Sequence, residues 1–302
     1  CLALLEGAQP LTMQRCVAPE VHRGSVVVAA ESLKLLSAIS LAPAGARRAL
    51  RDWPGAMRRA GIPAAVYAAQ NFLLQLAYPR LDSLLFNLIG QTKILFVAAS
   101  GWAVLGKRLS VQQLVALGMV TASALLTYER GEGGLPATQA SGGSDRQQQL
   151  GVLAQLAANA LSGINAALVE WALIGTDPMS FNVELGLCGV ISALLGLGLA
   201  RRAGEGRGRL LQGWTPLTSL APASMALNGL LTAFVIKGSG GIAKSFASVG
   251  AILVTALLRS RLEKRPLSQK QWALALPLAL GGVLTYSRFP ATTAYSRPAP
   301  AR

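Results

Sequence analysis

The chain has 302 residues, of which 52 % are hydrophobic and 14 % are charged, and its mean hydropathy is +0.44. This composition is more apolar than that of soluble globular domains and is typical of a membrane protein. The net charge of +15 would fit a nucleic-acid-binding protein, but the Lys and Arg residues lie mostly between apolar stretches, which argues against nucleic acid and predicts charged loops between membrane helices.

Apolar stretches long enough to span a membrane recur along the whole chain. A spanning helix needs about 20 mostly apolar residues, and Ala, Leu and Gly fill these stretches, which predicts helices packed through small side chains. Residues 1–14 resemble the end of one such helix, which we expect to begin upstream of Cys1. Nine further candidates follow, at residues 26–42, 61–79, 83–105, 111–128, 150–174, 182–200, 217–236, 242–258 and 271–287. The sequence therefore predicts an all-α, polytopic membrane helix bundle with about ten transmembrane helices.

A polar segment divides these stretches into two groups. Its sequence, RGEGGLPATQASGGSDRQQQ, is rich in Gly, Ser and Gln and predicts a flexible linker at 130–149. We therefore predict a first group of five helices at 1–129, a second group of five helices at 150–288, and a Pro-rich, disordered tail at 289–302.

The two groups are related by an internal repeat. LSVQQLVALGMVTASALLTYER at 109–130 matches LSQKQWALALPLALGGVLTYSR at 267–288, at an offset of 158 residues. The same offset aligns KIL at 93–95 with AIL at 251–253. The match includes the polar positions LS, Gln and LTY in addition to apolar ones, so we infer an ancient duplication. Because each half holds an odd number of helices, we expect two inverted repeats, an architecture that places a transported substrate between them.

The sequence lacks the residue patterns of enzymes and metal sites. Cys1, Cys16 and Cys188 are irregularly spaced, and His22 is the single histidine. This pattern predicts neither a disulfide framework nor a bound metal. No Ser/His/Asp set, HExxH motif or Walker loop occurs in the sequence, so we expect no cofactor and no catalytic activity.

Ionisable residues within the predicted spans are few, and each is a candidate for function because a charge inside a membrane is costly. Glu31 and Lys34 lie three residues apart on one helix and can pair with each other. Glu170 and Glu184 lie near predicted helix ends, where a carboxylate can reach the interface. Lys93 lies near the middle of its predicted helix, where reaching water is costly, which predicts that it faces a cavity.

Two lysines are predicted to share that cavity. Lys93 lies on the same helix face as Phe86 and Gly90, because these residues have i, i+4 and i+7 spacing. Lys244, just after GSGG at 238–241, is the counterpart of Phe86 at the repeat offset. Inverted symmetry would bring the two polar faces together, and two cations in one cavity suit an anionic substrate such as a phosphate.

Neutral polar residues add hydrogen-bonding groups to two other helices. Gln70 and Asn71 lie in YAAQNFLLQ, and Ser162 and Asn165 lie three residues apart in ALSGINAAL. Beside lysines, such groups could recognise a base or a sugar, and the alternative is that they are packing contacts between membrane helices.

Six segments spread over nearly the whole chain form a recognisable set. They are VVVAAESLKLL (26–36), GIPAAVYAAQNFL (61–73), GQTKIL (90–95), LSGINAALVEWAL (161–173), FNVELG (181–186) and GLLTAFVIKGSGGIAKSFAS (229–248). The QN, Q-x-K and K-x-F-A elements within them are fairly specific in combination. Together the segments resemble the nucleotide-sugar transporters of the drug/metabolite transporter superfamily, in particular the branch of CMP-sialic acid and UDP-galactose transporters.

The resemblance implies a fold, a function and a set of site residues. It implies ten helices in an inverted five-plus-five arrangement and an antiporter that exchanges a nucleotide sugar for a nucleoside monophosphate. The protein would lie in the Golgi membrane, or as a second choice in the ER membrane, in contact with lipid, and association into homo-oligomers is left open. Positions that contact the nucleotide or its phosphates in the family correspond to Asn71, Lys93, Ser162, Asn182 and Lys244. We add Gln70 and Phe86, whose ring could stack on a base, to the predicted substrate-binding residues.

The chain also departs from the family pattern, which leaves the base and the sugar open. The departures are Phe86, Gly90 and Gly186 where the family commonly has Tyr, Gly240-Gly241 in place of Asp-Asn, and Glu184 in place of Gln. Two alternatives remain: transport of another small metabolite, as in the wider superfamily, or a pseudotransporter that keeps the fold without transport.

Overall fold

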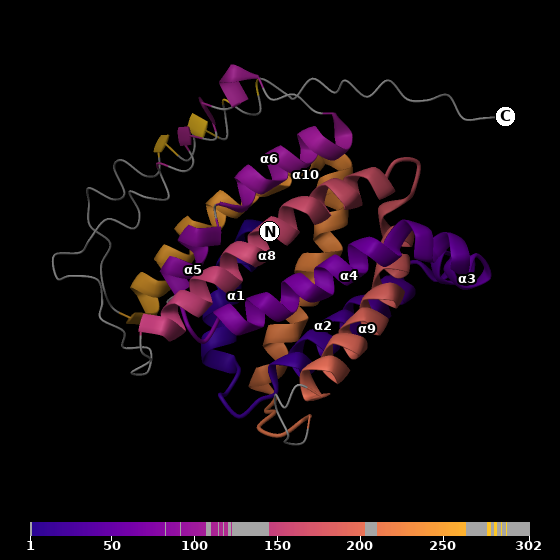
Figure 1. Cartoon of the computed structure of the whole chain (residues 1–302), viewed down its shortest axis with the longest axis horizontal. Helices are drawn as coiled ribbons and strands as arrows, with labels where there is room; N and C mark the ends of the chain where they lie inside the picture. The colour runs from indigo at the N-terminus through magenta and orange to yellow at the C-terminus, as the bar shows by residue number, and fades with distance from the viewer. Residues whose placement is uncertain are drawn as a thin grey trace.

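The computed structural model of the chain describes residues 2–81, 83–90, 92–106, 110–113, 145–202 and 210–263, with isolated positions within 115–122 and 277–288 (Figure 1). Every regular element in these ranges is helical, and no strand occurs among them, so the all-α prediction is confirmed for this part of the chain. Most of the predicted helices 111–128 and 271–287, most of the predicted linker and the predicted tail lie outside the described residues.

Residues 2–77 form four helices. They are α1 (Leu2–Cys16), α2 (Arg23–Leu41), α3 (Pro43–Arg51) and α4 (Trp53–Ala77). His22 caps α2, because its Nδ1 accepts a hydrogen bond from Gly24 N at 3.1 Å. Asp52 caps α4 in the same way by accepting from Gly55 N at 3.1 Å. The predicted helix 61–79 therefore begins earlier than expected, directly after this cap.

The predicted helix 83–105 is interrupted. In its place are α5 (Ser83–Gly90) and α6 (Lys93–Leu105). The prediction that Lys93 lies in mid-helix is wrong, because it is the first residue of α6. The amide nitrogen of Asn159, on a neighbouring helix, donates to Ile89 O and to Thr92 Oγ1, both at 2.8 Å. Thr92 Oγ1 also donates to Ile89 O, at 2.9 Å, so this carbonyl at the break is paired.

Within residues 145–263, the described part of the second group holds three long helices. They are α8 (Asp145–Ala172), α9 (Pro178–Arg202) and α10 (Leu220–Glu263), with a short 3₁₀ helix, η1 (Leu217–Ser219), before α10. α8 begins within the segment predicted as a linker. α10 covers the two predicted helices 217–236 and 242–258, which are joined end to end rather than separated by a loop.

Helix α10 is broken within its length at a glycine. Gly240 has φ 82° and ψ 165°, a conformation that is available essentially to glycine alone. The next backbone amide, Gly241 N, donates to Glu170 Oε2 on α8 at 3.0 Å. Lys237, before the break, donates from Nζ to Leu173 O at 2.6 Å. The break therefore begins a new helical segment whose first amide is held by a carboxylate from another helix.

The helices pack as a row that is covered by two others. α8 lies between α4 and α6, and α9 lies between α4 and α2, which gives the order α6, α8, α4, α9, α2. α10 contacts α2, α6, α8 and α9, and α1 packs along α10 (Figure 1). Helices from residues 2–16 and 220–263, far apart in the sequence, are thus brought to the same central region.

Small residues allow these helices to approach closely, as the composition predicts. A Cβ added at Gly7 of α1 would lie 2.6 Å from the carbonyl oxygen of Ala251 on α10. Gly163 of α8 faces the backbone of Phe96 on α6, and Gly196 of α9 lies against the ring of Phe72 on α4 in a similarly close contact. Contact through small side chains is the usual packing mode of helices in membranes.

Among the described residues, four helical segments are long and apolar enough to cross a membrane. They are Arg23–Leu41, Arg146–Ala172, Pro178–Leu199 and Leu217–Gly241. Large apolar side chains also point outward: Leu36, Trp102, Leu195 and Leu199 are each more than 60 % exposed. Such a surface suits lipid rather than water, and the chain is a membrane protein with several apolar helices.

Candidate functional site

A cavity of about 140 Å³ lies between helices from both parts of the chain. Its lining comes from α1, α2, α4, α5, α6, α8, α9 and α10. Six of the seven residues predicted to bind substrate line it: Gln70, Asn71, Phe86, Lys93, Ser162 and Lys244. Residues separated by as much as 174 positions in the sequence thus meet at one place.

Asn182 is the predicted site residue that the structure does not bring to the cavity lining. Its side chain is fully buried between α9 and α10, where Nδ2 donates to Leu230 O at 3.2 Å. In this arrangement Asn182 holds two helices together.

The two predicted lysines share one carboxylate. Glu6 Oε2 of α1 lies 3.8 Å from Lys93 Nζ, and Glu6 Oε1 lies 3.5 Å from Lys244 Nζ. All three side chains are at most 17 % exposed. Lys93 is the first residue of α6, and Lys244 follows the break in α10 at Gly240. Both lysines therefore lie in the first turn of a helical segment, where backbone amides also favour an anion.

Glu6 is a charged residue of the candidate site that the sequence analysis does not single out. It lies in LALLEGAQP, an apolar stretch that was interpreted only as the end of a helix. The signal that could have found it is the one that identified Lys93, a charge within an apolar run.

A second ion pair lines the cavity, and its two residues pair with each other as the sequence predicts. Lys34 and Glu31 of α2 pair at i, i+3 spacing, and both are buried. The Lys34 ammonium also lies 5.7 Å from the ring centroid of Tyr67, within the range of a cation–π interaction. Asn71 Nδ2 lies 3.5 Å from Glu31 Oε1. This polar group spans α2 and α4 on one side of the cavity.

Three amide oxygens in the cavity wall are available to a ligand. The side-chain oxygens of Gln70, Gln155 and Asn228 are buried and accept no hydrogen bond from the described residues. Buried polar atoms are nearly always paired in folded proteins. These acceptors, from α4, α8 and α10, therefore suit donor groups on a bound molecule such as amides or hydroxyls.

An aromatic pair forms another part of the wall. The rings of Phe86 and Tyr78 stack with centroids 4.5 Å apart and an interplanar angle of 17°. Gly90, one helical turn after Phe86, also faces the cavity, and a Cβ added there would lie 3.6 Å from Gln155 Nε2. The missing side chain at Gly90 therefore leaves space inside the cavity.

Gly186, in contrast, is a packing position. A Cβ added there would lie 3.1 Å from both the Cα and the Cβ of Leu35 on α2. The close approach of α2 and α9 explains a glycine here.

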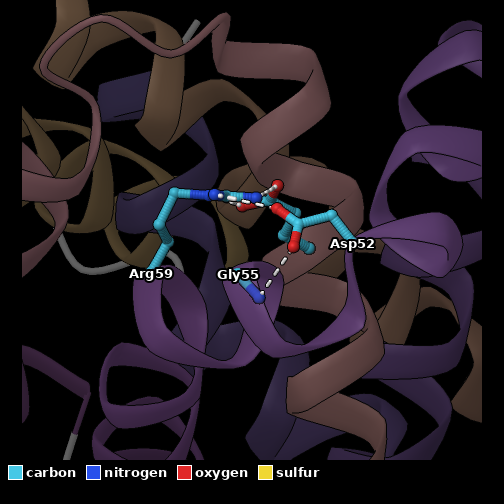
Figure 2. A network of polar contacts seen from close by, with 4 residues as sticks. Asp52, Gly55 and Arg59 are labelled. Carbon is cyan, nitrogen blue, oxygen red and sulfur yellow. Dashed lines mark hydrogen bonds and ion pairs between the residues drawn. The ribbon is translucent and has the colours of Figure 1, made fainter.

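Glu184 of α9 is buried and forms an ion pair with Arg59 of α4. Its carboxylate is 4 % exposed and accepts two hydrogen bonds from Arg59, at 2.9 Å from Nε and 2.5 Å from the terminal Nη2. Arg59 also lies 3.5 Å from Asp52, the residue that caps α4 through Gly55 (Figure 2). A bidentate pair of this kind is geometrically specific, and here it joins α4 to α9.

The cavity thus combines ammonium groups, amides and an aromatic pair. Among the described residues, no group of three or more His, Cys, Asp or Glu side chains is arranged to hold a metal ion. The chemistry of the wall is that of binding an anion with a polar, partly aromatic body.

Comparisons with known proteins agree with this chemistry. The family model described as nucleotide-sugar transporter matches residues 24–286. The chain is 36 % identical over 299 residues to the UDP-N-acetylglucosamine transporter ROCK1 of Arabidopsis thaliana. This alignment covers 96 % of this chain and 90 % of that protein.

More distant relatives and one solved structure match as well. The human UDP-N-acetylglucosamine transporter is 28 % identical over 80 % of this chain and 77 % of its own length. The UDP-galactose translocator of Canis lupus familiaris is 29 % identical over 75 % of this chain and 56 % of its own length. A crystal structure with 17 % identity and a TM-score of 0.66 covers 95 % of this chain and 94 % of that one, which supports the fold alone. The family match and the Arabidopsis relative establish that the chain belongs to the nucleotide-sugar transporter family, whose members are transporters and not enzymes.

Proposed function

We propose that this protein carries a UDP-sugar across the Golgi membrane in exchange for UMP, with UDP-N-acetylglucosamine as the first candidate substrate and the ER membrane as the second candidate location. The observation that carries this proposal is the pair Lys93 and Lys244 facing one cavity beside unpaired amide oxygens. The names of the relatives supply the uridine nucleotide and the sugar.

The cavity chemistry supports a nucleotide with phosphate groups. Two ammonium groups near helix starts favour a diphosphate or a monophosphate over a neutral solute. The Phe86–Tyr78 pair offers an aromatic surface for a base. The amides of Gln70, Gln155 and Asn228 can accept from the base or from sugar hydroxyl and acetamido groups.

The predicted inverted repeat supports an exchange mechanism. Lys93 comes from the first predicted half and Lys244 from the second, so a substrate bound to both would lie between the halves. Rocking of one repeat against the other around such a site is how inverted-repeat carriers alternate access. A nucleotide sugar and a nucleoside monophosphate share the phosphate that both lysines would bind, so one site can serve both directions.

Ligand-dependent thermal stability tests the proposal. Purified protein should be heated with CMP, UMP, GMP or AMP, because a ligand that binds only the folded state stabilises it by about 2.7 kcal/mol at one hundred times its Kd. We expect UMP to raise the Tm most and Lys93→Ala to abolish the shift, with Arg48→Ala, an exposed cation on α3, as the matched control. A Tm that does not respond to any nucleotide would favour another metabolite or a protein that does not transport.

A further inference from the structure

The position of Glu6 between the two substrate lysines carries an inference beyond the proposed exchange. Glu6 comes from α1, Lys93 from α6 and Lys244 from α10, and the two carboxylate oxygens each face a different ammonium group, at 3.8 Å and 3.5 Å. The carboxylate thus occupies the position between two cations where a substrate phosphate would be expected.

The charges of the cavity wall show what Glu6 changes. Among the described lining residues, Lys34, Lys93 and Lys244 carry positive charge and Glu6 and Glu31 carry negative charge, which leaves one net positive charge. Glu31 and Lys34 neutralise each other. Without Glu6, the ion pairs that its carboxylate forms with Lys93 and Lys244 would be lost.

The cost of burying cations in a carrier is greatest when the cavity holds no substrate. Charges removed from water need a partner of opposite sign, because burial without one is costly. Consider a carrier whose lysines are neutralised by substrate alone. Its empty form is disfavoured in any intermediate that is closed to both sides of the membrane. The carrier then changes conformation only with substrate bound, so transport is obligatory exchange. A carboxylate supplied by the protein removes this penalty.

We propose that Glu6 is an internal counter-anion that replaces the substrate phosphate in the empty cavity, so that the unloaded protein can change conformation and release nucleotide without exchange. The proposal rests on the proposed function. It has a second consequence, because substrate and Glu6 compete for the same ammonium groups: Glu6 weakens nucleotide binding while it speeds the return of the empty carrier.

Proteoliposomes preloaded with labelled UMP separate these effects. Efflux into nucleotide-free buffer measures net release, and efflux into buffer containing unlabelled UMP measures exchange. We expect wild-type protein to show both, and Glu6→Gln to lower the ratio of net release to exchange by roughly tenfold. Glu20→Gln, an exposed carboxylate outside the cavity, should leave the ratio unchanged. An equal ratio in wild type and Glu6→Gln would overturn the proposal.

Binding provides a readout that does not depend on transport. Glu6→Gln should bind UMP roughly tenfold more tightly than wild type, measured as the UMP concentration that half-saturates the Tm shift. If Glu6→Gln fails to fold, Glu6→Asp, whose carboxylate is one methylene shorter, should show the same changes to a smaller extent. Unchanged or weaker UMP binding in a folded variant would contradict the competition.

The two proposals fail in different ways. If wild type shows neither exchange nor a Tm shift with any nucleotide, the proposed function is wrong. If exchange is present and the ratio does not depend on Glu6, the function stands and the role of Glu6 is wrong.

Discussion

At the scale of single residues, the buried ion pair beside the cavity depends on glycines in the neighbouring helices. Glu31 and Lys34 are both about 95 % buried. Gly189 of α9 lies directly against the Glu31 carboxylate, and a Cβ at Gly229 of α10 would lie 3.0 Å from Lys34 Cδ. The absence of side chains at these two positions gives the pair its space.

Gly189→Ala tests this arrangement. The added methyl would collide with the Glu31 carboxylate, and a shift of that carboxylate would disturb its ion pair with Lys34, so we expect a loss of about 1–3 kcal/mol in the free energy of unfolding. Gly198→Ala, on the same helix with no atom within 4 Å of the added Cβ, should be neutral or stabilising by about 0.5–1 kcal/mol. Thermal unfolding in detergent would compare them, and equal Tm values would show that the pair adapts freely.

At the scale of elements, the site is built where helices are interrupted. The break between α5 and α6 precedes Lys93, and the break at Gly240 precedes Lys244. Irregular backbone inside a membrane protein is tolerated where it lines a cavity or is buried in protein. Asn159 and Glu170, both on α8, bind backbone or side-chain groups at these two breaks, so one helix supports both lysine-bearing segments.

Gly240→Ala should damage both stability and binding. An alanine in the Gly240 conformation is strained by about 1–3 kcal/mol, and relief of the strain would straighten α10 and displace Lys244. We expect a lower Tm and a smaller stabilisation by UMP. Gly238→Ala is the matched control, because it lies two residues away on the same helix and its added Cβ meets no atom within 4 Å. If the two variants respond equally to UMP, the break does not position the lysine.

At the scale of the whole molecule, the sequence predicts the features that depend on local residue patterns, such as the positions of helices. It does not predict helix breaks and side-chain contacts that depend on partners distant in the sequence. Apolar runs locate most of the described helices, and Lys93 and Lys244 line one cavity, as predicted. The break before Lys93 depends on Asn159, which is 66 residues further along the chain. The position of Glu6 depends on the packing of α1 against α10, and Asn182 binds Leu230 O rather than the cavity. Such partners cannot be identified from helix periodicity alone.

The Arg59–Glu184 pair links the two predicted halves of the molecule, because α4 belongs to the first and α9 to the second. Arg59→Ala would leave the Glu184 carboxylate, 4 % exposed, without its bidentate partner. Loss of a partner from a fully buried pair costs about 3–5 kcal/mol. Arg59 is 29 % exposed, so water screens part of this interaction and we expect a loss of about 2 kcal/mol.

The double variant Arg59→Leu/Glu184→Leu separates the cost of an unpaired carboxylate from the loss of the contact. Replacing both charges by apolar side chains is often nearly neutral for a buried pair, so its Tm should be well above that of Arg59→Ala. Arg58→Ala, the exposed neighbour on α4, should change the free energy of unfolding by no more than about 0.5 kcal/mol. If the double variant is no more stable than Arg59→Ala, the pair holds α4 and α9 together through its specific geometry, and the halves would then separate more readily in both variants.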